Sequence, residues 1–229
     1  VTKMGEPADL AGPVTLGDLI AEVHSLARVR PIFHSEADFQ HALAWHLHER
    51  WPAARIRLEY RPFAAEKVYL DLWFALGEHA WAIELKYTSR QIDVTRDGER
   101  FALITQGAQD ILRYDYIKDI TRVERIAQTH RNVDGLALLL TNDPVLWLPP
   151  TGRLNVDGQF KLNEGRKLLG VLDWEAHTGG TKKGRETPHH LRGMYTAHWQ
   201  DYSEMPGQGA SSQFRFLAIH AAGTPKVDS

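Results

Sequence analysis

Residues 68–87 read VYLDLWFALGEHAWAIELKY and contain two segments in which apolar residues alternate with other residues. A period of two predicts β-strands, here over residues 68–74 and 81–87. In the first strand the face opposite the main apolar residues carries Asp71. In the second strand that face carries Glu84 and Lys86. Charge therefore collects on one face of both predicted strands.

The residues between the strands predict a tight hairpin. Gly77 stands where a two-residue type II′ turn requires glycine. With Gly77 and Glu78 as the loop, Leu76 pairs with His79, and counting back places Asp71 opposite Glu84. Facing residues of an antiparallel pair lie about 5 Å apart at Cβ, where like charges are destabilising. The same count places Tyr69 opposite Lys86.

Two interpretations account for the facing carboxylates. In one, the face is exposed and both groups are solvated, with Lys86 neutralising them. In the other, the pair binds a divalent cation, because Mg²⁺ takes carboxylate oxygens. Ala82 shares this face, and its small size indicates close packing there. We favour the cation.

Asp71, followed one hairpin later by Glu84-Leu85-Lys86, resembles the Asp…(Asp/Glu)-x-Lys signature of the PD-(D/E)xK nuclease superfamily. Leu70 stands where the family name has proline. The resemblance covers residues 35–142 and implies a Mg²⁺- or Mn²⁺-dependent nuclease that hydrolyses phosphodiester bonds, with DNA endonuclease as the leading activity. It implies that Asp71, Glu84 and the Leu85 carbonyl hold the metal. Lys86 would orient the attacking water or stabilise the developing charge.

Glu36 is a further candidate metal ligand with two interpretations. Ser35 is a predicted helix N-cap, and an acidic residue in the first turn complements the helix dipole. The family resemblance instead implies an acidic residue on the first core helix that points at the sheet. The sequence leaves both open.

The order of elements predicts an α/β fold with a restriction-endonuclease-like core at residues 35–143. This core is a helix from residue 35, strands at 55–60, 68–74 and 81–87, a helix at 101–125 and a strand at 135–141. Residues 1–34 are expected to be an N-terminal segment with one packing helix. Residues 144–229 are expected to form a β-rich extension packed on the core, with strands at 168–174, 190–195 and 214–220.

Several polar residues outside the motif are candidates for contact with a nucleic-acid backbone, although a surface loop or a solvated helix face would explain them equally. They occur in the connector 88–100, on the helix at 101–125 and in a glycine-rich basic loop at 177–190. They are Arg90, Arg96, Gln106, Gln109, Lys182, Lys183 and Arg185.

Composition limits the remaining choices. The 27 Lys and Arg residues nearly balance 29 Asp and Glu residues, so any phosphate-binding patch must be local. The chain contains no cysteine, which excludes disulfides, thiol nucleophiles and Cys-ligated zinc. No apolar run approaches the ~20 residues that span a bilayer. We expect a cytoplasmic protein with no membrane partner. The oligomeric state is left open, a homodimer being one candidate.

Two alternatives to a nuclease stay open. The chain can be a catalytically silent nucleic-acid-binding or protein-interaction module that keeps the same fold, or the three charged residues can form a structural salt-bridge network. Tight binding of Mg²⁺ or Mn²⁺ would separate the nuclease from the structural network.

Overall fold

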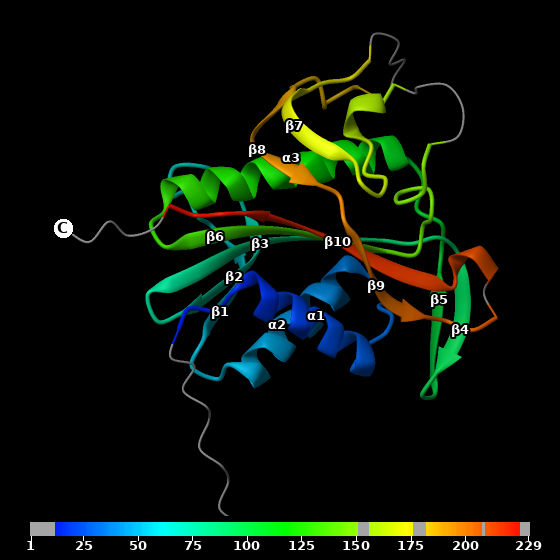
Figure 1. Ribbon diagram of the computed structural model, residues 1–229. Helices are drawn as coiled ribbons and strands as arrows, with labels where there is room; N and C mark the ends of the chain where they lie inside the picture. Colours follow the sequence, from blue (N-terminus) through cyan, green and yellow to red (C-terminus); the bar gives the residue numbers. More distant parts are fainter. Residues whose placement is uncertain (1–11, 151–155, 176–181, 208, 225–229) are drawn as a thin grey trace, which may run out of the picture.

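The fold is a central β-sheet with helices on both faces, seen in the computed structural model of residues 12–150, 156–175, 182–207 and 209–224. Helices α1 and α2 cover one face and α3 covers the other (Figure 1). None of the helices among these residues is long and apolar enough to cross a membrane. The elements are α1 (Leu16–Val29), α2 (Glu36–Arg50), β1 (Arg55–Tyr60), β2 (Leu70–Leu76), β3 (His79–Thr88), β4 (Ile92–Arg96), β5 (Glu99–Leu103), α3 (Gln109–Thr129), β6 (Val133–Thr141), β7 (Lys167–Leu172), β8 (His189–Thr196), β9 (Trp199–Glu204) and β10 (Gln213–Ala221), with short 3₁₀ turns at Gly158–Phe160 and Gly209–Ser211.

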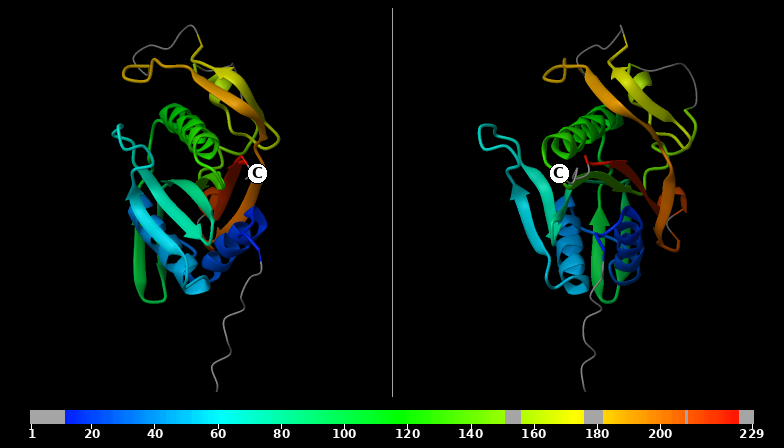
Figure 2. Two further views of the ribbon diagram at one scale, coloured as in Figure 1. Left: turned by 90° about the vertical axis from the view of Figure 1, so that its left-hand side faces the viewer. Right: turned by 60° about the vertical axis from the view of Figure 1, so that its left-hand side comes forward.

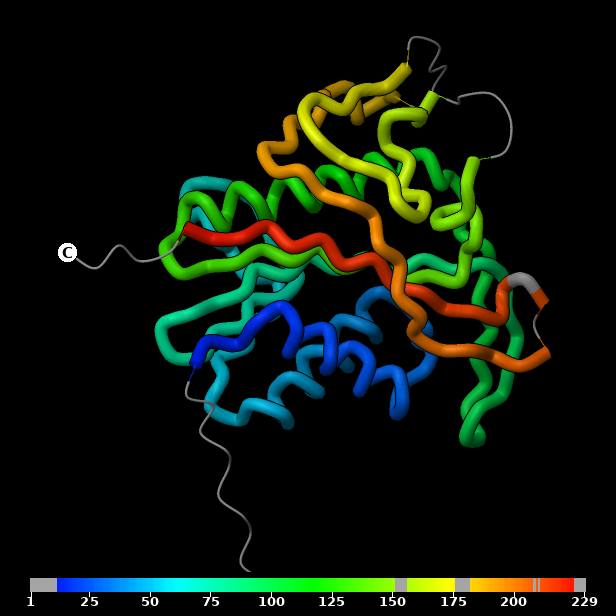
Figure 3. The backbone as a smooth tube through the Cα atoms, in the orientation of Figure 1, coloured from blue at the N-terminus to red at the C-terminus, as the bar shows by residue number. Residues whose placement is uncertain are grey.

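The sheet is mixed, as an α/β chain was expected to give. Its strand order is β1-β2-β3-β6-β10-β9. Strands β1, β2 and β3 form the predicted antiparallel meander, and β3 runs parallel to β6. Strands β9 and β10, from the region expected to be a C-terminal extension, continue the sheet beyond β6 (Figure 3). The β7–β8 ribbon lies over α3 in both views of Figure 2.

The predicted hairpin between β2 and β3 is confirmed. Leu76 pairs with His79, and the register continues to Leu72 opposite Ile83. Gly77 has a φ of 59°, whereas the φ of Glu78 is not positive. A type II′ turn requires this combination. Ala82 is fully buried in the core beneath α3, as its small size indicated.

The predicted connector 88–100 is wrong, because it contains most of a second hairpin. Strand β4 pairs with β5 around Asp97 and Gly98, whose φ angles are 51° and 82°. An Asp-Gly turn between alternating segments is a hairpin signal. The many charged residues of this stretch made the alternation hard to recognise. The apolar side of the hairpin, with Ile92 and Phe101, packs into the core on the α1–α2 side.

The predicted helix 101–125 starts eight residues too early. Helix α3 begins at Gln109, after Ala108 in the left-handed conformation with a φ of 63°. Phe101 to Leu103 belong to β5, and the side chain of Ile104 is 75% exposed. The apolar residues of this segment recur at helical spacing, so their pattern did not indicate where the strand ends and the helix begins. Strand β9 was not predicted at all.

Gly135 allows α3 to lie against β6, and its replacement should destabilise the protein. A Cβ atom at Gly135 would lie 2.7 Å from the Val123 carbonyl oxygen of α3. We therefore expect Gly135→Ala to lower the free energy of unfolding by about 1–3 kcal/mol, the usual cost of overpacking. Chemical denaturation measures it. Gly107→Ala is the control, because a Cβ there meets no atom within 4 Å. Equal stability of the two variants would contradict the close approach.

Candidate functional site

The site lies where β2 separates from β3. The pairing between them ends at Leu72 and Ile83, one position before Asp71 and Glu84. Beyond this point two backbone amides of β3 bind side chains instead of a strand. The Leu85 N–H donates to Asp71 Oδ2 at 2.6 Å, and the Tyr87 N–H donates to Glu36 Oε2 at 2.9 Å. Two of the predicted acidic residues thus complete the free edge of β3.

Helix α2 positions both of these carboxylates. Ser35 is its N-cap, as predicted, and accepts a hydrogen bond from the Asp38 amide. Glu36 begins the helix and reaches β3, so both interpretations of this residue fit its geometry. One turn later Gln40 donates through Nε2 to the backbone oxygen of Asp71 at 2.7 Å. Burial is the main cause that raises the pKa of Glu36, while Lys86 opposes the shift.

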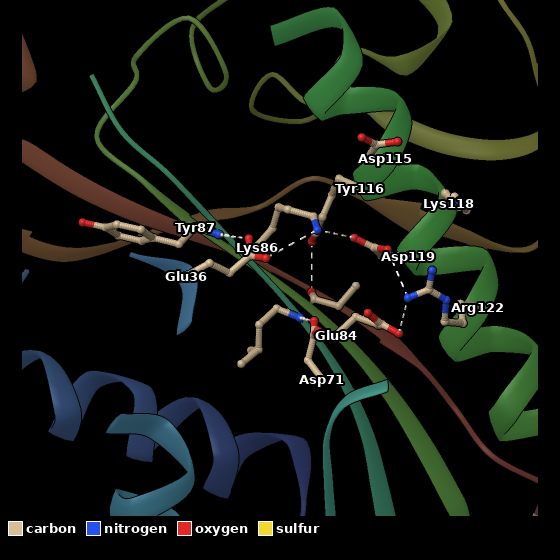
Figure 4. Close-up of polar contacts among 12 residues, drawn as sticks. Glu36, Asp71, Glu84, Lys86, Tyr87, Asp115, Tyr116, Lys118, Asp119 and Arg122 are labelled. Atoms are coloured by element: carbon tan, nitrogen blue, oxygen red, sulfur yellow. Dashed lines mark hydrogen bonds and ion pairs between the residues drawn. The ribbon is translucent and has the colours of Figure 1, made fainter. Parts of the chain in front are cut away.

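Glu84 is buried on the face of β3 that α3 covers (Figure 4). Its side chain is 3% exposed, and Oε1 accepts a hydrogen bond from Arg122 at 2.6 Å. Burial raises the pKa of Glu84 to about 9, and Asp119 and Asp71 add to the shift, while Arg122 opposes it. The ion pair with Arg122 compensates only part of the cost of burying this carboxylate.

Lys86 projects into the same space between two carboxylates. Its Nζ lies 3.4 Å from Asp119 Oδ2 and 3.9 Å from Glu36 Oε1 (Figure 4). Burial works to lower the pKa of Lys86, but the surrounding carboxylates, Asp119 first, outweigh it and raise the pKa. Lys86 therefore stays protonated at neutral pH and is available as a cation or hydrogen-bond donor.

Asp119 and Arg122, both on α3, belong to the site and were not predicted. Asp119 is 5% exposed, and burial raises its pKa to about 6. Its Oδ2 has no hydrogen-bond partner among the described residues. A signal existed in the sequence, since Asp119 interrupts the apolar run Tyr116, Ile117 and Ile120 of α3. Charged residues inside an apolar stripe are informative because they are rarely buried without a role.

Together these side chains form what we call the carboxylate cluster. It contains four carboxylates and two cations, and is therefore short of positive charge. Among the described residues no three acidic or histidine side chains are arranged to hold one metal ion. The chemistry of the donors nevertheless suits Mg²⁺ or Mn²⁺, because the hard carboxylate oxygens of Asp71, Glu84 and Asp119 are close enough to repel one another. The members are Glu36, Asp71, Glu84, Asp119, Lys86 and Arg122.

The predicted nucleic-acid contacts do not gather at this cluster. Arg90 and Gln109 meet at Asp143, with contacts of 3.5 and 3.1 Å. The remaining ones are dispersed. Arg96 pairs with Asp97 in the β4–β5 turn, Gln106 binds Ser89 through its backbone amide, Lys182 pairs with Asp173, Arg185 pairs with Asp115, and Lys183 is exposed. Part of the loop 177–190, residues 177–181, lies outside the described residues.

Comparisons of the chain with protein-family models, with curated proteins and with solved structures give no match. The functional argument therefore rests on the residues of the carboxylate cluster and on the surface around it.

Proposed function

We propose that the protein is a metal-dependent nuclease of the PD-(D/E)xK type, with Mg²⁺ or Mn²⁺ as cofactor and DNA as the expected substrate. The observation that carries this proposal is the meeting of Asp71, Glu84 and Lys86 at the point where β2 leaves β3. The core of helix, meander, helix and strand that the proposal requires agrees with the order α2, β1–β3, α3 and β6, with the β4–β5 hairpin inserted.

The deficit of positive charge supports a cation site. Glu84 and Asp119 both have raised pKa values, and each is repelled by Asp71. A divalent ion beside them would favour the ionised carboxylates and reduce their mutual repulsion. Asp71 and Glu84 would hold it, with the Leu85 carbonyl and Glu36 as further ligands. When bound, the metal would lower the pKa of a coordinated water and screen the charge of the scissile phosphate.

The residues of the chain would supply the remaining chemistry. Two hydrogen bonds hold Asp71 in place: its carboxylate accepts one from the Leu85 amide, and its backbone carbonyl accepts one from Gln40. Asp71 is therefore preorganised. Lys86, held at neutral pH as an ammonium group, would position the attacking water by hydrogen bonding or stabilise charge on the phosphate oxygen. Arg122 would be released from Glu84 to pair with a phosphate.

A catalytically silent binding module is the second candidate. One observation favours it: Glu84 is already paired with Arg122, and Lys86 lies close to Asp119. In a silent module these ion pairs would hold β3 to α3 without a metal ion. Incubation of the protein with plasmid, linear duplex, single-stranded DNA and RNA, with Mg²⁺, Mn²⁺ or chelator, decides between them. Metal-dependent cleavage supports the nuclease, and no cleavage of any substrate supports the silent module.

The affinity for Mg²⁺ or Mn²⁺ should increase with pH. The pKa of Glu84 is raised to about 9, so its proton must leave before the carboxylate binds a cation. Between pH 7 and pH 9 we expect the logarithm of the association constant to rise with a slope approaching one, and to flatten above pH 9. Calorimetry in two buffers of different ionisation enthalpy measures the proton released. In Glu84→Gln this release should disappear, and a pH-independent affinity in the wild type would contradict the assignment.

A further inference from the structure

A second functional feature is a groove beside the carboxylate cluster. Its volume is about 740 Å³, and its walls come from the chain entering β2, from α3 and from the start of β8. Arg122 belongs to both the groove and the cluster, so the two are continuous. The lining residues that matter below are Lys67, Tyr69, Lys118, Arg122, Arg125 and His189.

The groove is strongly basic in a chain whose net charge is −2. Five lining residues are Lys or Arg, against one carboxylate. That carboxylate, Glu124, is buried and accepts hydrogen bonds from the backbone amides of Arg192 and Gly193 and from the Tyr195 hydroxyl. Lys67 and Lys118 are exposed and make no ion pair among the residues that the structure describes. Their charges are therefore available to an anion.

The cations are arranged along one direction. Lys118, Arg122 and Arg125 are spaced by four and three residues, so they share one face of α3. This face passes from the groove wall to Glu84, since Arg122 contacts that carboxylate. A polyanion that followed the three residues would reach the carboxylate cluster.

One other exposed group in the groove suits a nucleobase. Tyr69, half exposed, offers a ring on which a base can stack. His189 is 7% exposed, and its Nε2 has no hydrogen-bond partner within the described part of the chain. Burial, followed by the charge of Lys118, lowers the pKa of His189 to about 4, so the imidazole is neutral at physiological pH. Its Nε2 is closed off from solvent and its ring packs against Tyr114 at 4.3 Å between centroids, so His189 belongs to the buried wall of the groove.

From the basic charge and the exposed tyrosine of this groove, we propose that it binds a single strand of nucleic acid and leads it to the carboxylate cluster. The proposal rests on the proposed nuclease function and adds the substrate class. A volume of about 740 Å³ is that of a site for a drug-sized ligand, which admits a few nucleotides of one strand and not the width of a duplex. Phosphates would pair with Lys67 and Lys118, since Arg125 is already paired with Glu66, and a base would stack on Tyr69.

Fluorescence anisotropy in chelator, where no cleavage can occur, tests the groove directly. The probes are labelled single-stranded DNA, single-stranded RNA of the same sequence, and the corresponding DNA duplex. We expect at least one single strand to bind more tightly than the duplex. The double variant K67S/K118S should weaken that binding at least about tenfold and make the log-log salt dependence shallower by about 1.4, which is two phosphate contacts on a single strand. Tyr69→Leu should weaken it about tenfold, and Tyr69→Trp should not.

The control is R55S/K167S, which removes two exposed charges from β1 and β7 outside the groove. Three results would each overturn the proposal that the groove binds a single strand. They are an equal loss of affinity in this control and in K67S/K118S, an unchanged affinity in K67S/K118S, and equally tight binding of the duplex. A separate cleavage assay with Mg²⁺ distinguishes the two proposals. Binding through the groove without cleavage overturns only the nuclease. Cleavage by a K67S/K118S protein at the wild-type rate and affinity overturns only the groove.

Discussion

Replacement of Lys86 by alanine should abolish cleavage while leaving the affinity for Mg²⁺ or Mn²⁺ equal or higher. The ammonium group acts on the water or the phosphate in the proposed reaction, so its loss should lower the rate by about 10²–10³-fold or more. The cation should bind at least as well, because one positive charge leaves a site that already contains Asp119 and Glu36 within 4 Å. Single-turnover cleavage and calorimetry measure the two quantities.

Lys86→Met keeps the apolar stem of the side chain and separates lost charge from lost packing. It should be as inactive as Lys86→Ala, and thermal melting verifies that both variants are folded. If the protein is a silent binding module, the same substitution should weaken nucleic-acid affinity only modestly and reduce its salt dependence by about one unit. Cleavage by Lys86→Ala at the wild-type rate would remove Lys86 from the mechanism and with it most of the support for the motif.

The variant Glu84→Gln should be at least as stable as the wild type in chelator, and its advantage should grow with pH. The folded-state pKa of about 9 lies above the ordinary glutamate value of 4.5, so the wild type loses stability as pH rises between these values, by at most about 1.4 kcal/mol per unit. Glutamine does not titrate, and its amide oxygen can still accept from Arg122. We expect a midpoint about 2–4 °C higher near pH 8 for each 1 kcal/mol gained.

The same variant should lose any rise of the melting midpoint that Mg²⁺ produces in the wild type. Asp71→Asn should lose this rise as well. It is a suitable companion variant, because the amide oxygen of the new side chain can still accept a hydrogen bond from the Leu85 N–H. Thermal melts at pH 5 and pH 8, with chelator and with Mg²⁺, supply all the comparisons. Strong destabilisation of either variant in chelator would mean that the carboxylates are structural.

The hairpin of β2 and β3 was predictable because its signals are local. Alternation over residues 68–74 and 81–87 and the glycine of the turn fix the register, and the structure agrees to Leu72 and Ile83. The start of α3 was not predictable from periodicity, because strand β5 and the helix have apolar residues at compatible spacings. Residues 104–108 separate them, and Ala108, just before the helix, is left-handed, a conformation for which alanine carries no sequence signal.

Part of the candidate site depends on tertiary placement that no local pattern records. Asp71, Glu84 and Lys86 lie on one hairpin, so their proximity follows from its register. Asp119 and Arg122 reach them only because α3 crosses the face of β3, a contact between segments distant in the sequence. The dispersal of Arg96 and Lys182 away from the cluster has the same origin, since residues on separate loops come together only if the fold directs them.

The position of β10 inside the sheet bears on how the chain is made. This strand, the last of the described chain, lies between β6 and β9, and its pairing with β6 runs from Arg215 opposite Thr141 to Ala221 opposite Gly135. During synthesis β6, a strand of apolar residues, can pair with β3 but must wait for β10 to cover its other edge. An uncovered apolar edge is a template for pairing with another chain. Ribosome-bound and C-terminally truncated chains should therefore depend on chaperones until β10 has emerged.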